Sequence, residues 1–274
     1  MNLSKKIISK LGAIILSLTM VIGLSACGKS TASNSEKGKV DKIKESGKLV
    51  IGTCADYPPY EFHKTVNGKD EIVGFDITIA KEIAKDLGVK LEIKDMKFDG
   101  LLAALQSGNV DMVIAGMNPT EERKKSVDFS TVYYEAIQTV LVRAEDKDKF
   151  KTLDDFKGKK IGVQKSTTQE EVAKKQMTSS DIKSLSKVTD LALELQNKKV
   201  DGLVLEKPVA ITYANNAKGF AMSLAKFENA DKGASVATKK GNKDLLDAIN
   251  KTLDKLIKAK SIDKFVTDAN KLVQ

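Results

Sequence analysis

Short apolar stretches alternate with amphipathic stretches along most of this chain, and the alternation limits the folds that it can adopt. The first three apolar stretches read as strands and the two between them as helices; in chain order they cover residues 49–53, 75–87, 89–93, 98–107 and 110–115. In the longer helical stretch, apolar side chains recur every four residues and Gly88 supplies the helix end. This order predicts an α/β fold with a mainly parallel sheet.

The pattern starts again after the polar stretch 144–151, so we expect a second α/β lobe. A strand at 139–143 precedes the break, and the predicted elements after it are 152–156 (helix), 160–164 (strand), a helix from Ser166, 189–198 (helix), 200–205 (strand) and a helix from Pro208. A strand at 233–238 is expected to return to the first lobe, before helices at 242–260 and 262–273. With 274 residues, 41% of them hydrophobic, the chain is long enough for two cores.

The first 26 residues have the pattern of a bacterial lipoprotein signal. A short lysine-containing start precedes an apolar run from Leu11 to Leu24, and small residues separate this run from Cys27. We expect cleavage before Cys27 and attachment of a lipid to it, which would anchor the protein to the outer face of the cell membrane. Residues 27–40, rich in Gly, Ser and Lys, read as a flexible tether. The alternative is an uncleaved anchor, for which the apolar run is short.

The charge pattern argues against binding of nucleic acid. The whole chain has a formal charge of +9, and removal of residues 1–26 removes three lysines and no acid, which leaves +6. The lysines are scattered, arginine occurs only as Arg123 and Arg143, and no basic run is interleaved with aromatic residues. A lysine-rich surface near an anionic membrane accounts for this charge.

Cysteine and histidine are too few for a disulfide framework or a typical metal site. With Cys27 assigned to the lipid, Cys54 has no partner, and His63 is the single histidine. We therefore expect no disulfide, no metal and no cofactor.

The candidate site is organised around residues 112–134, where a strand runs through Gly116 into a helix start. We expect Asn118 to cap that helix, with Pro119 in its first turn and Arg123 one turn further on. Free N–H groups at a helix start and the guanidinium fork of an arginine both suit a carboxylate. An ordinary strand–helix connection with a solvated arginine has the same pattern, so this stretch alone leaves both interpretations open.

A second predicted strand, 160–164, also ends at a helix start. Thr167 and Glu170 fit the capping box at that start. If both helix starts face one cleft, the cleft has two places that favour a small anion.

Five segments, spread over nearly the whole chain after Gly47, carry a family resemblance. They are LVIGTCADYPPYEF (49–62), IVGFDITIAKEIAKDLGVK (72–90), FDGLLAALQSGNVDMVIAGMNPTEERKKSVDFS (98–130), GKKIGVQKSTTQE (158–170) and VDGLVLEKPVA (200–210). In this order they resemble the polar amino-acid substrate-binding proteins of ABC importers, family 3 of the extracellular solute-binding proteins, in lipoprotein form. The resemblance implies a two-lobe periplasmic-binding-protein-like fold of type II, with the ligand cleft between lobes joined by two hinge strands.

On this expectation, lobe 1 covers residues 41–142 and 234–274, and lobe 2 covers residues 143–233. The chain would cross between them near Val142–Glu145 and Glu228–Gly233.

The residues and the resemblance together give the expected ligand-binding positions, which are Asp56, Tyr57, Phe98, Gly116, Asn118, Arg123, Gln164, Thr167, Thr168, Gln169 and Glu206. The resemblance implies that Arg123 pairs with the α-carboxylate of the ligand. It implies that the loop of Gly116 and Asn118, and the helix start at residues 167–169, add hydrogen bonds to the same carboxylate.

The other positions concern the rest of the ligand. The resemblance implies that Tyr57 stacks on the ligand, that Phe98 forms a wall and that Glu206 pairs with the α-ammonium. Asp56 is expected either to contact the ligand side chain or to cap its own loop, and Gln164 is expected to lie in the cleft.

An α-amino acid is a zwitterion, so its site needs a cationic and an anionic pole, which Arg123 and Glu206 supply. We therefore expect a monomeric extracytoplasmic receptor that binds a free amino acid, passes it to the permease subunits of an ABC importer and performs no chemistry. Acids near the cleft favour arginine or lysine, and glutamine and cystine are the alternatives within the family. A cyclohexadienyl dehydratase-like enzyme is the alternative outside it, with Glu206 as general acid.

Overall fold

The computed structural model describes residues 37–216, 219–228 and 232–273. The expected signal segment, the expected lipid attachment site Cys27 and the tether up to residue 36 lie outside these ranges. Within them, no helix has the length and apolar character that crossing a membrane requires. The chain from Lys37 onward forms one compact unit.

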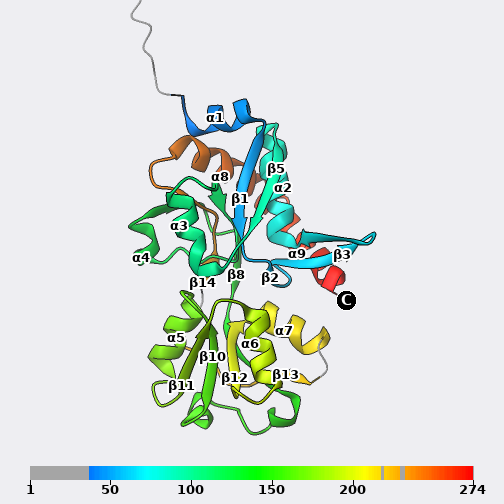
Figure 1. The fold of residues 1–274 in the computed structure, drawn as a ribbon, viewed down its shortest axis with the longest axis vertical. Helices are drawn as coiled ribbons and strands as arrows, with labels where there is room; N and C mark the ends of the chain where they lie inside the picture. Colours follow the sequence, from blue (N-terminus) through cyan, green and yellow to red (C-terminus); the bar gives the residue numbers. More distant parts are fainter. Residues whose placement is uncertain (1–36, 217–218, 229–231, 274) are drawn as a thin grey trace, which may run out of the picture. The chain divides into compact units, whose positions relative to one another are not determined.

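Two five-stranded sheets divide this unit into two lobes. Lobe 1 contains α1 (Lys39–Ser46), β1 (Lys48–Thr53), β2 (Asp56–Tyr57), β3 (Glu61–Val66), β4 (Lys69–Val73), α2 (Phe75–Leu87), β5 (Lys90–Asp95), η1 (Phe98–Gly100), α3 (Leu101–Gln106), β6 (Met112–Val113), α4 (Glu121–Lys124), β7 (Val127–Phe129), β15 (Ala237–Lys239), α8 (Lys243–Lys258) and α9 (Ser261–Val273). Lobe 2 contains β9 (Gln138–Arg143), η2 (Ala144–Asp146), η3 (Leu153–Phe156), β10 (Lys160–Gln164), α5 (Thr168–Gln176), β11 (Asp181–Leu185), α6 (Val188–Gln196), β12 (Gly202–Glu206), α7 (Lys207–Asn216) and β13 (Phe220–Met222). Strands β8 (Tyr134–Ala136) and β14 (Lys232–Ala234) lie between the lobes (Figure 1).

The two sheets follow one plan. In lobe 1 the strand order is β5-β1-β6-β15-β7, with β1 parallel to β5 and β6, and β15 antiparallel to both of its neighbours. In lobe 2 the order is β11-β10-β12-β9-β13, where β10 is parallel to its neighbours and β9 is antiparallel to its own. In each sheet the strand order reverses at one strand, β1 in lobe 1 and β10 in lobe 2. Open α/β sheets bind ligands at such points, outside the carboxyl ends of the strands.

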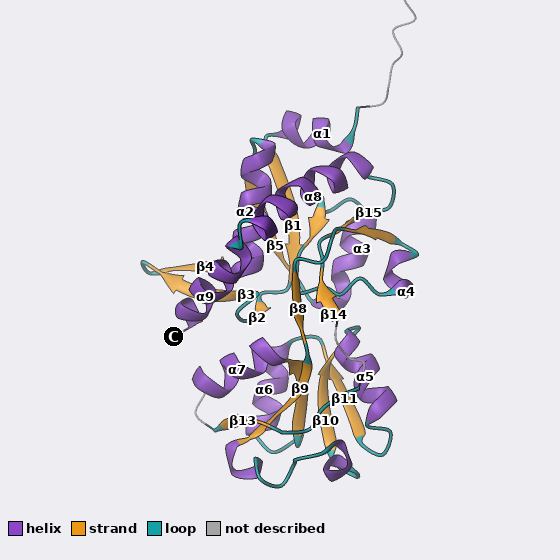
Figure 2. Cartoon of the chain, turned by 180° about the vertical axis from the view of Figure 1, so that it is seen from behind, coloured by secondary structure: helices purple, strands orange, loops and turns teal. Residues whose placement is uncertain are grey.

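The crossing between the lobes differs from the expectation. Strand β9 was expected at the end of lobe 1, but it pairs with β12 and β13 inside the lobe 2 sheet. The first crossing is therefore made by β8 at Tyr134–Ala136, before Val142–Glu145, and β8 pairs with the returning strand β14 (Figure 2).

The return was expected as one strand over residues 233–238, and the structure divides it in two. Strand β14 pairs with β8 between the lobes, and β15 pairs with β6 and β7 in the lobe 1 sheet. Between them, the Ser235 N–H donates to the Met117 carbonyl and the Val236 N–H donates to the Ser130 hydroxyl. The chain changes partners at this point, so one continuous ladder does not form.

Local sequence accounts for helix α2. Phe75, Ile79 and Ile83 are buried along one face, and Gly88 ends the helix in the left-handed conformation, as predicted. Gly74 precedes the helix with φ +130, and a Cβ there would lie 2.0 Å from the Tyr60 carbonyl oxygen. The helix start and the loop that contains Tyr60 are therefore held against each other.

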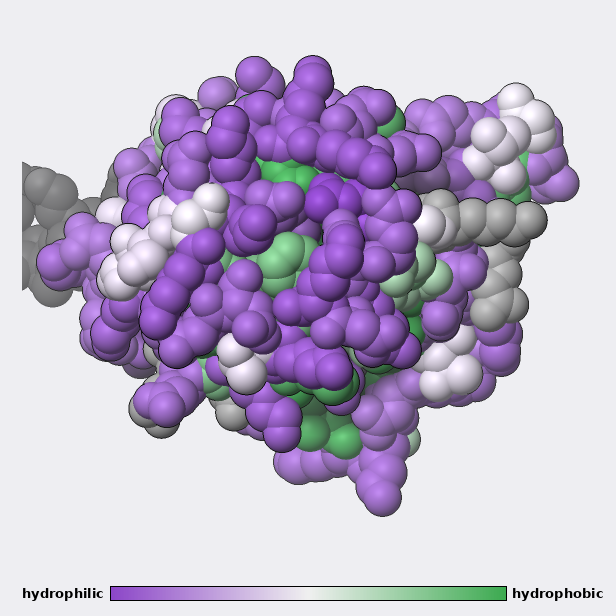
Figure 3. All heavy atoms as spheres, turned by 90° about the horizontal axis from the view of Figure 1, so that it is seen from below, coloured by the Kyte–Doolittle hydropathy of each residue, from purple (hydrophilic) through white to green (hydrophobic). Residues whose placement is uncertain are grey.

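Lobe 2 presents a mainly hydrophilic surface at its end. In the view of Figure 3, hydrophilic residues cover most of this face, and apolar residues show only in patches between them. This agrees with the scattered lysines of the sequence.

Candidate functional site

A small cavity lies where strands of both lobes end. Its lining residues are Cys54, Asp56, Tyr57, Glu61, Phe98, Ala115, Gly116, Asn118, Gln164, Thr167 and Gln169. Most of the expected ligand-binding positions are in this set. The remaining three, Arg123, Thr168 and Glu206, each bond to Asn118. The structure therefore brings all of the expected positions into one cluster.

Arg123 forms the cationic side of this cluster. It is 9% exposed, and its Nη1 donates to the Asn118 carbonyl while its Nη2 donates to the Ser166 carbonyl of lobe 2, each at 2.8 Å. Its guanidinium lies 5.5 Å from the centre of the Phe98 ring. Burial lowers the pKa of Arg123, but an arginine remains charged at physiological pH. Among the described residues, no carboxylate lies within ion-pair distance of it.

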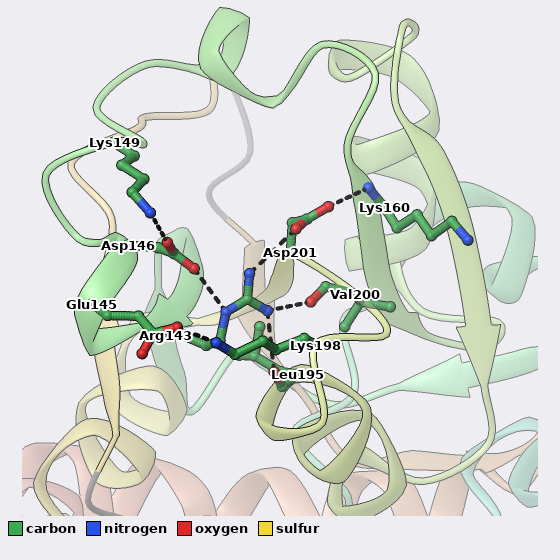
Figure 4. A network of polar contacts seen from close by, with 9 residues as sticks. All are labelled: Arg143, Glu145, Asp146, Lys149, Lys160, Leu195, Lys198, Val200 and Asp201. Atoms are coloured by element: carbon green, nitrogen blue, oxygen red, sulfur yellow. Dashed lines mark hydrogen bonds and ion pairs between the residues drawn. The ribbon is translucent and has the colours of Figure 1, made fainter.

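Arg143, in contrast, has both its charge and its hydrogen-bond donors satisfied by other residues of the chain. Its Nε pairs with Asp146 at 2.7 Å and its Nη2 with Asp201 at 3.2 Å, while Nη1 donates to the carbonyls of Leu195 and Val200 (Figure 4). The Arg123 guanidinium bonds to carbonyls only, and the charge of Glu171 acts on it without forming an ion pair, so Arg123 keeps a charge that an anionic ligand can neutralise.

Glu206, at the carboxyl end of β12, forms the anionic side. It is 1% exposed, Tyr60 donates its hydroxyl hydrogen to Oε2, and Asn118 Nδ2 donates to Oε1 at 3.4 Å. Burial raises the pKa of Glu206 to about 7, although these two hydrogen bonds and one with the Gln138 side chain oppose the rise. Its own backbone N–H donates to the Tyr57 hydroxyl oxygen at 3.1 Å, which ties this strand end to lobe 1.

Two further buried acids lie beside Glu206. Glu61 is 1% exposed, and its Oε2 has no hydrogen-bond partner among the described residues. Burial and the neighbouring Asp76 raise the pKa of Glu61 well above its usual value. Asp76 accepts hydrogen bonds from the Gly116 N–H and the Tyr133 hydroxyl, both at 2.8 Å. Asp76 therefore holds the loop that carries Gly116, and Glu61, which also forms a side-chain hydrogen bond with Asp76, lines the cavity beside it.

Asn118 does not cap the helix that follows it, so that expectation is wrong. The cap is Thr120, whose hydroxyl accepts from the Arg123 N–H, and helix α4 has only 4 residues. Asn118 instead donates to the Gly233 carbonyl at 3.2 Å and accepts from the Thr168 hydroxyl at 2.6 Å. Its amide therefore connects lobe 1 with lobe 2 and with the return strand.

The second helix start agrees with half of the expected capping box. Thr167 is the N-cap of α5 and accepts from the Glu170 N–H. The Glu170 carboxylate accepts from the Ser166 N–H rather than from the cap residue itself. Ser166 has a positive φ of 64, an uncommon conformation that presents its carbonyl to Arg123.

Gln164 and Gln169 line the cavity on the side of lobe 2. Gln164 Nε2 donates to the Ser186 carbonyl at 3.1 Å and lies 3.7 Å from the Cys54 sulfur. Gln169 Nε2 donates to the Gln138 side chain at 3.0 Å. Cys54 is free and buried, and burial raises the pKa of its thiol, so it is not a reactive thiolate. The described residues contain no His, Cys, Asp and Glu cluster suited to a metal ion.

Sequence reasoning missed two contributors to the site. Tyr60 is an aromatic residue that suits the core, and it is fully buried against Phe75 at a ring distance of 4.4 Å, yet its hydroxyl reaches Glu206 across the lobes. Gln138 lies one residue before the predicted strand 139–143, and its buried side chain forms a hydrogen bond with Glu206 that opposes the rise in the pKa of that carboxyl. Its pairing opposite Glu206 in the antiparallel ladder could not be read from local sequence.

Most of this chain is similar to known proteins. A family model for bacterial extracellular solute-binding proteins, family 3, matches residues 49–268. The arginine-binding extracellular protein ArtP of Bacillus subtilis (strain 168) is 37% identical over 248 residues, which cover 89% of this chain and 91% of that protein. The L-cystine-binding protein TcyJ of Escherichia coli (strain K12) is 33% identical over 253 residues, or 92% of each chain.

A solved structure is also similar. It is an amino acid ABC transporter substrate-binding protein from Streptococcus pneumoniae Canada MDR_19A bound to L-arginine, with a TM-score of 0.84, 36% identity, and coverage of 86% of this chain and 98% of that chain. The fold expected from the sequence, two α/β lobes of the periplasmic-binding-protein type, is thereby confirmed, and the chain belongs to the bacterial extracellular solute-binding proteins, family 3.

Proposed function

We propose that this protein is a lipid-anchored extracytoplasmic receptor that binds a cationic amino acid, arginine or lysine, and delivers it to the permease subunits of an ABC importer. It works without catalysis and without a cofactor. The family assignment supports the receptor class, and relatives whose names or titles record arginine support the ligand class.

The observation that carries the proposal is the buried Arg123 guanidinium without a carboxylate partner among the described residues. Arg123 bonds only to two backbone carbonyls, and Glu206 is bonded to the same Asn118. A free amino acid brings an α-carboxylate for Arg123 and an α-ammonium for Glu206, so each pole of the zwitterion meets its counter-charge. A ligand without one of these groups would leave a buried charge unpaired, which costs several kcal/mol.

The preference for a cationic side chain rests on Glu61. Glu61 lines the cavity, and burial together with its contact with Asp76 raises its pKa well above the usual value, so it lies among further carboxyls without a cation beside it in the described residues. A guanidinium or ammonium at the end of the ligand side chain would supply donors and reduce the repulsion between these acids. Tyr57 and Phe98 line the same cavity and offer flat apolar faces to the methylene groups between the two ends.

The experiment is a thermal-shift screen of residues 37–274 against the twenty amino acids, cystine, ornithine and citrulline, followed by calorimetry on each hit. At about 100 times its dissociation constant, a ligand adds roughly 2.7 kcal/mol of stability. We expect shifts with arginine, lysine or ornithine and a much smaller shift with citrulline, which has the length of arginine without the charge. A shift confined to glutamine or cystine would keep the receptor and reject the cationic preference.

The dehydratase remains the second candidate because of one observation. Glu206 is a fully buried carboxyl that bonds to Asn118 of the cavity wall, and burial raises its pKa to about 7, which suits a general acid at neutral pH. Incubation of the protein with arogenate and prephenate decides between the candidates. Turnover that is lost in Glu206→Gln would replace the receptor proposal, and the absence of turnover together with amino-acid binding would support it.

The anchor is tested separately. Wild-type protein expressed in a Gram-positive host should incorporate labelled palmitate and fractionate with membranes. Cys27→Ala should lose the label and remain uncleaved or pass into the medium. Labelling that persists in Cys27→Ala would contradict the anchor assignment.

A further inference from the structure

We propose that Asp56 acts as an interlobe clasp: its carboxylate caps the start of helix α6 in the opposite lobe and stabilises the arrangement in which both lobes enclose the candidate site. Asp56 is thus a positioning residue and does not bind the charged side chain of the ligand. The ligand-binding measurements below rest on the proposed function; the scattering measurement does not.

The first step is the contact itself. Asp56 belongs to β2 in lobe 1 and is 3% exposed. Its Oδ2 accepts the backbone N–H of Val188, the first residue of α6, at 2.7 Å. Lys187, at the N-cap position of that helix, provides no side-chain cap. Because the first N–H groups of a helix need acceptors and carry partial positive charge, α6 obtains its cap from the other lobe.

The second oxygen of Asp56 is also engaged. The Cys54 thiol donates to Oδ1 at 3.3 Å, and burial keeps this thiol protonated by raising its pKa. One oxygen is therefore held within lobe 1 and the other is bonded to lobe 2. A carboxylate with both oxygens occupied is poorly placed to bind the ligand side chain.

Neighbouring contacts support the same role for β2. Tyr57, the next residue, accepts the backbone N–H of Glu206 at 3.1 Å, so two consecutive side chains of this two-residue strand bind backbone groups of lobe 2. Lys187 adds an ion pair to Asp95 of lobe 1, with 3.8 Å between Nζ and Oδ2. The start of α6 and the end of β12 are thus both fixed against β2.

The chain offers a matched control. Asp244 of α8 accepts the Val40 N–H in the first turn of α1 at 2.8 Å, which is also a cap supplied from a distant part of the sequence. Both of these helices belong to lobe 1. Asp244→Ala therefore removes a cap of the same kind without touching the contact between the lobes.

The experiment compares wild type, Asp56→Ala, Asp244→Ala and the double variant Asp56→Ala with Lys187→Ser, in which serine gives α6 a cap of its own. Stopped-flow and calorimetry measure the dissociation rate and affinity for arginine and for citrulline, and small-angle scattering measures the radius of gyration. We expect Asp56→Ala to dissociate about 10-fold faster or more, since it loses a hydrogen bond to a charged group. The affinities for arginine and for citrulline should fall by the same factor. Asp244→Ala should bind as wild type, and the double variant should recover thermal stability but not affinity.

Three results would overturn the clasp: loss of arginine binding with citrulline binding unchanged, unchanged affinity in Asp56→Ala, or affinity restored by Lys187→Ser. If wild type binds no amino acid at all, the proposed function fails, and scattering alone decides the clasp. A larger radius of gyration in Asp56→Ala than in wild type and Asp244→Ala would then support it, and equal radii would refute it.

Discussion

The two arginines of this chain have the same side chain and opposite roles. Arg143 is surrounded by two carboxylates and two carbonyls, which satisfy its charge and its donors. Arg123 is equally buried but bonds only to carbonyls. A buried cation with neutral partners is costly for stability and useful for an anionic ligand, so the first arginine belongs to the structure and the second to the function.

This contrast predicts opposite effects of one substitution at the two positions. Arg123→Ala should abolish amino-acid binding and should not lower the free energy of unfolding of the ligand-free protein, since it removes a buried charge that has no ion-pair partner. Arg143→Ala should lower the free energy of unfolding by about 3 kcal/mol, because Asp146 and Asp201 lose their buried counter-charge, while folded protein still binds. Calorimetry with arginine and urea unfolding measure the two effects. Retained binding in Arg123→Ala would contradict the site assignment.

The sequence supported Arg123 as a candidate because it lies one turn into a helix start that follows a strand, and the family resemblance added Glu206 at the end of another strand. It did not reveal the role of Asn118, because the residue type suits a helix cap as well as a cross-cleft amide. Only the tertiary structure brings Thr168 and Glu206 within its reach. Tyr60 was missed for a related reason: one aromatic side chain fills the core with its ring and reaches the site with its hydroxyl.

At the scale of elements, the long helices were predictable, whereas one strand was assigned to the wrong lobe and the return strand proved to be two. The bounds of α2 match the prediction because its apolar spacing and its end at Gly88 are local signals. Strand β9 was recognised as a strand but assigned to the wrong lobe, since its apolar side chains would fit either sheet. Its antiparallel pairing with β12, some sixty residues away, places β9 in the lobe 2 sheet. No local sequence pattern encodes such a pairing.

The start of α5 gives a prediction at this scale. Thr167 caps the helix and also donates to the Gln164 carbonyl at 2.6 Å, so it fixes the turn between β10 and α5. Thr167→Ala should lower the free energy of unfolding by about 1 kcal/mol, and Thr167→Ser, which keeps the hydroxyl, should lower it by less. Urea unfolding of the three proteins measures this difference. Equal stability of the alanine variant and wild type would show that the cap contributes nothing.

At the scale of the whole molecule, the cluster of buried acids links stability to pH. Burial raises the pKa of Asp56 and Asp76 from 3.8 to about 6 and that of Glu206 from 4.5 to about 7. Between pH 4.5 and pH 7 the folded protein therefore holds more protons than the unfolded chain, and the free energy of unfolding falls as pH rises. Stability without ligand should be greater at pH 5 than at pH 8, by an amount on the order of a few kcal/mol.

Thermal unfolding of wild type and Glu206→Gln across pH 4.5 to 8 measures this effect. The glutamine variant keeps the shape of the side chain but has no proton to lose, so its midpoint should change less with pH and exceed that of wild type at pH 8. A wild-type midpoint that rises steadily with pH would show that these acids are ionised in the folded state without cost.

A cationic ligand should reverse this dependence. If arginine binds the ionised forms of the acids, binding releases protons between pH 5 and pH 7, and by linkage its affinity rises with pH over that range. The thermal shift caused by arginine should therefore be larger at pH 8 than at pH 5.5, although the ligand-free protein is less stable at pH 8. Calorimetry at pH 6.5 in phosphate and in imidazole buffers should give different apparent enthalpies, because the two buffers take up the released protons with different heats. Equal enthalpies and a shift independent of pH would mean that the acids are already ionised before the ligand arrives, and the attraction of the site for a cation would then be fully present in the free protein.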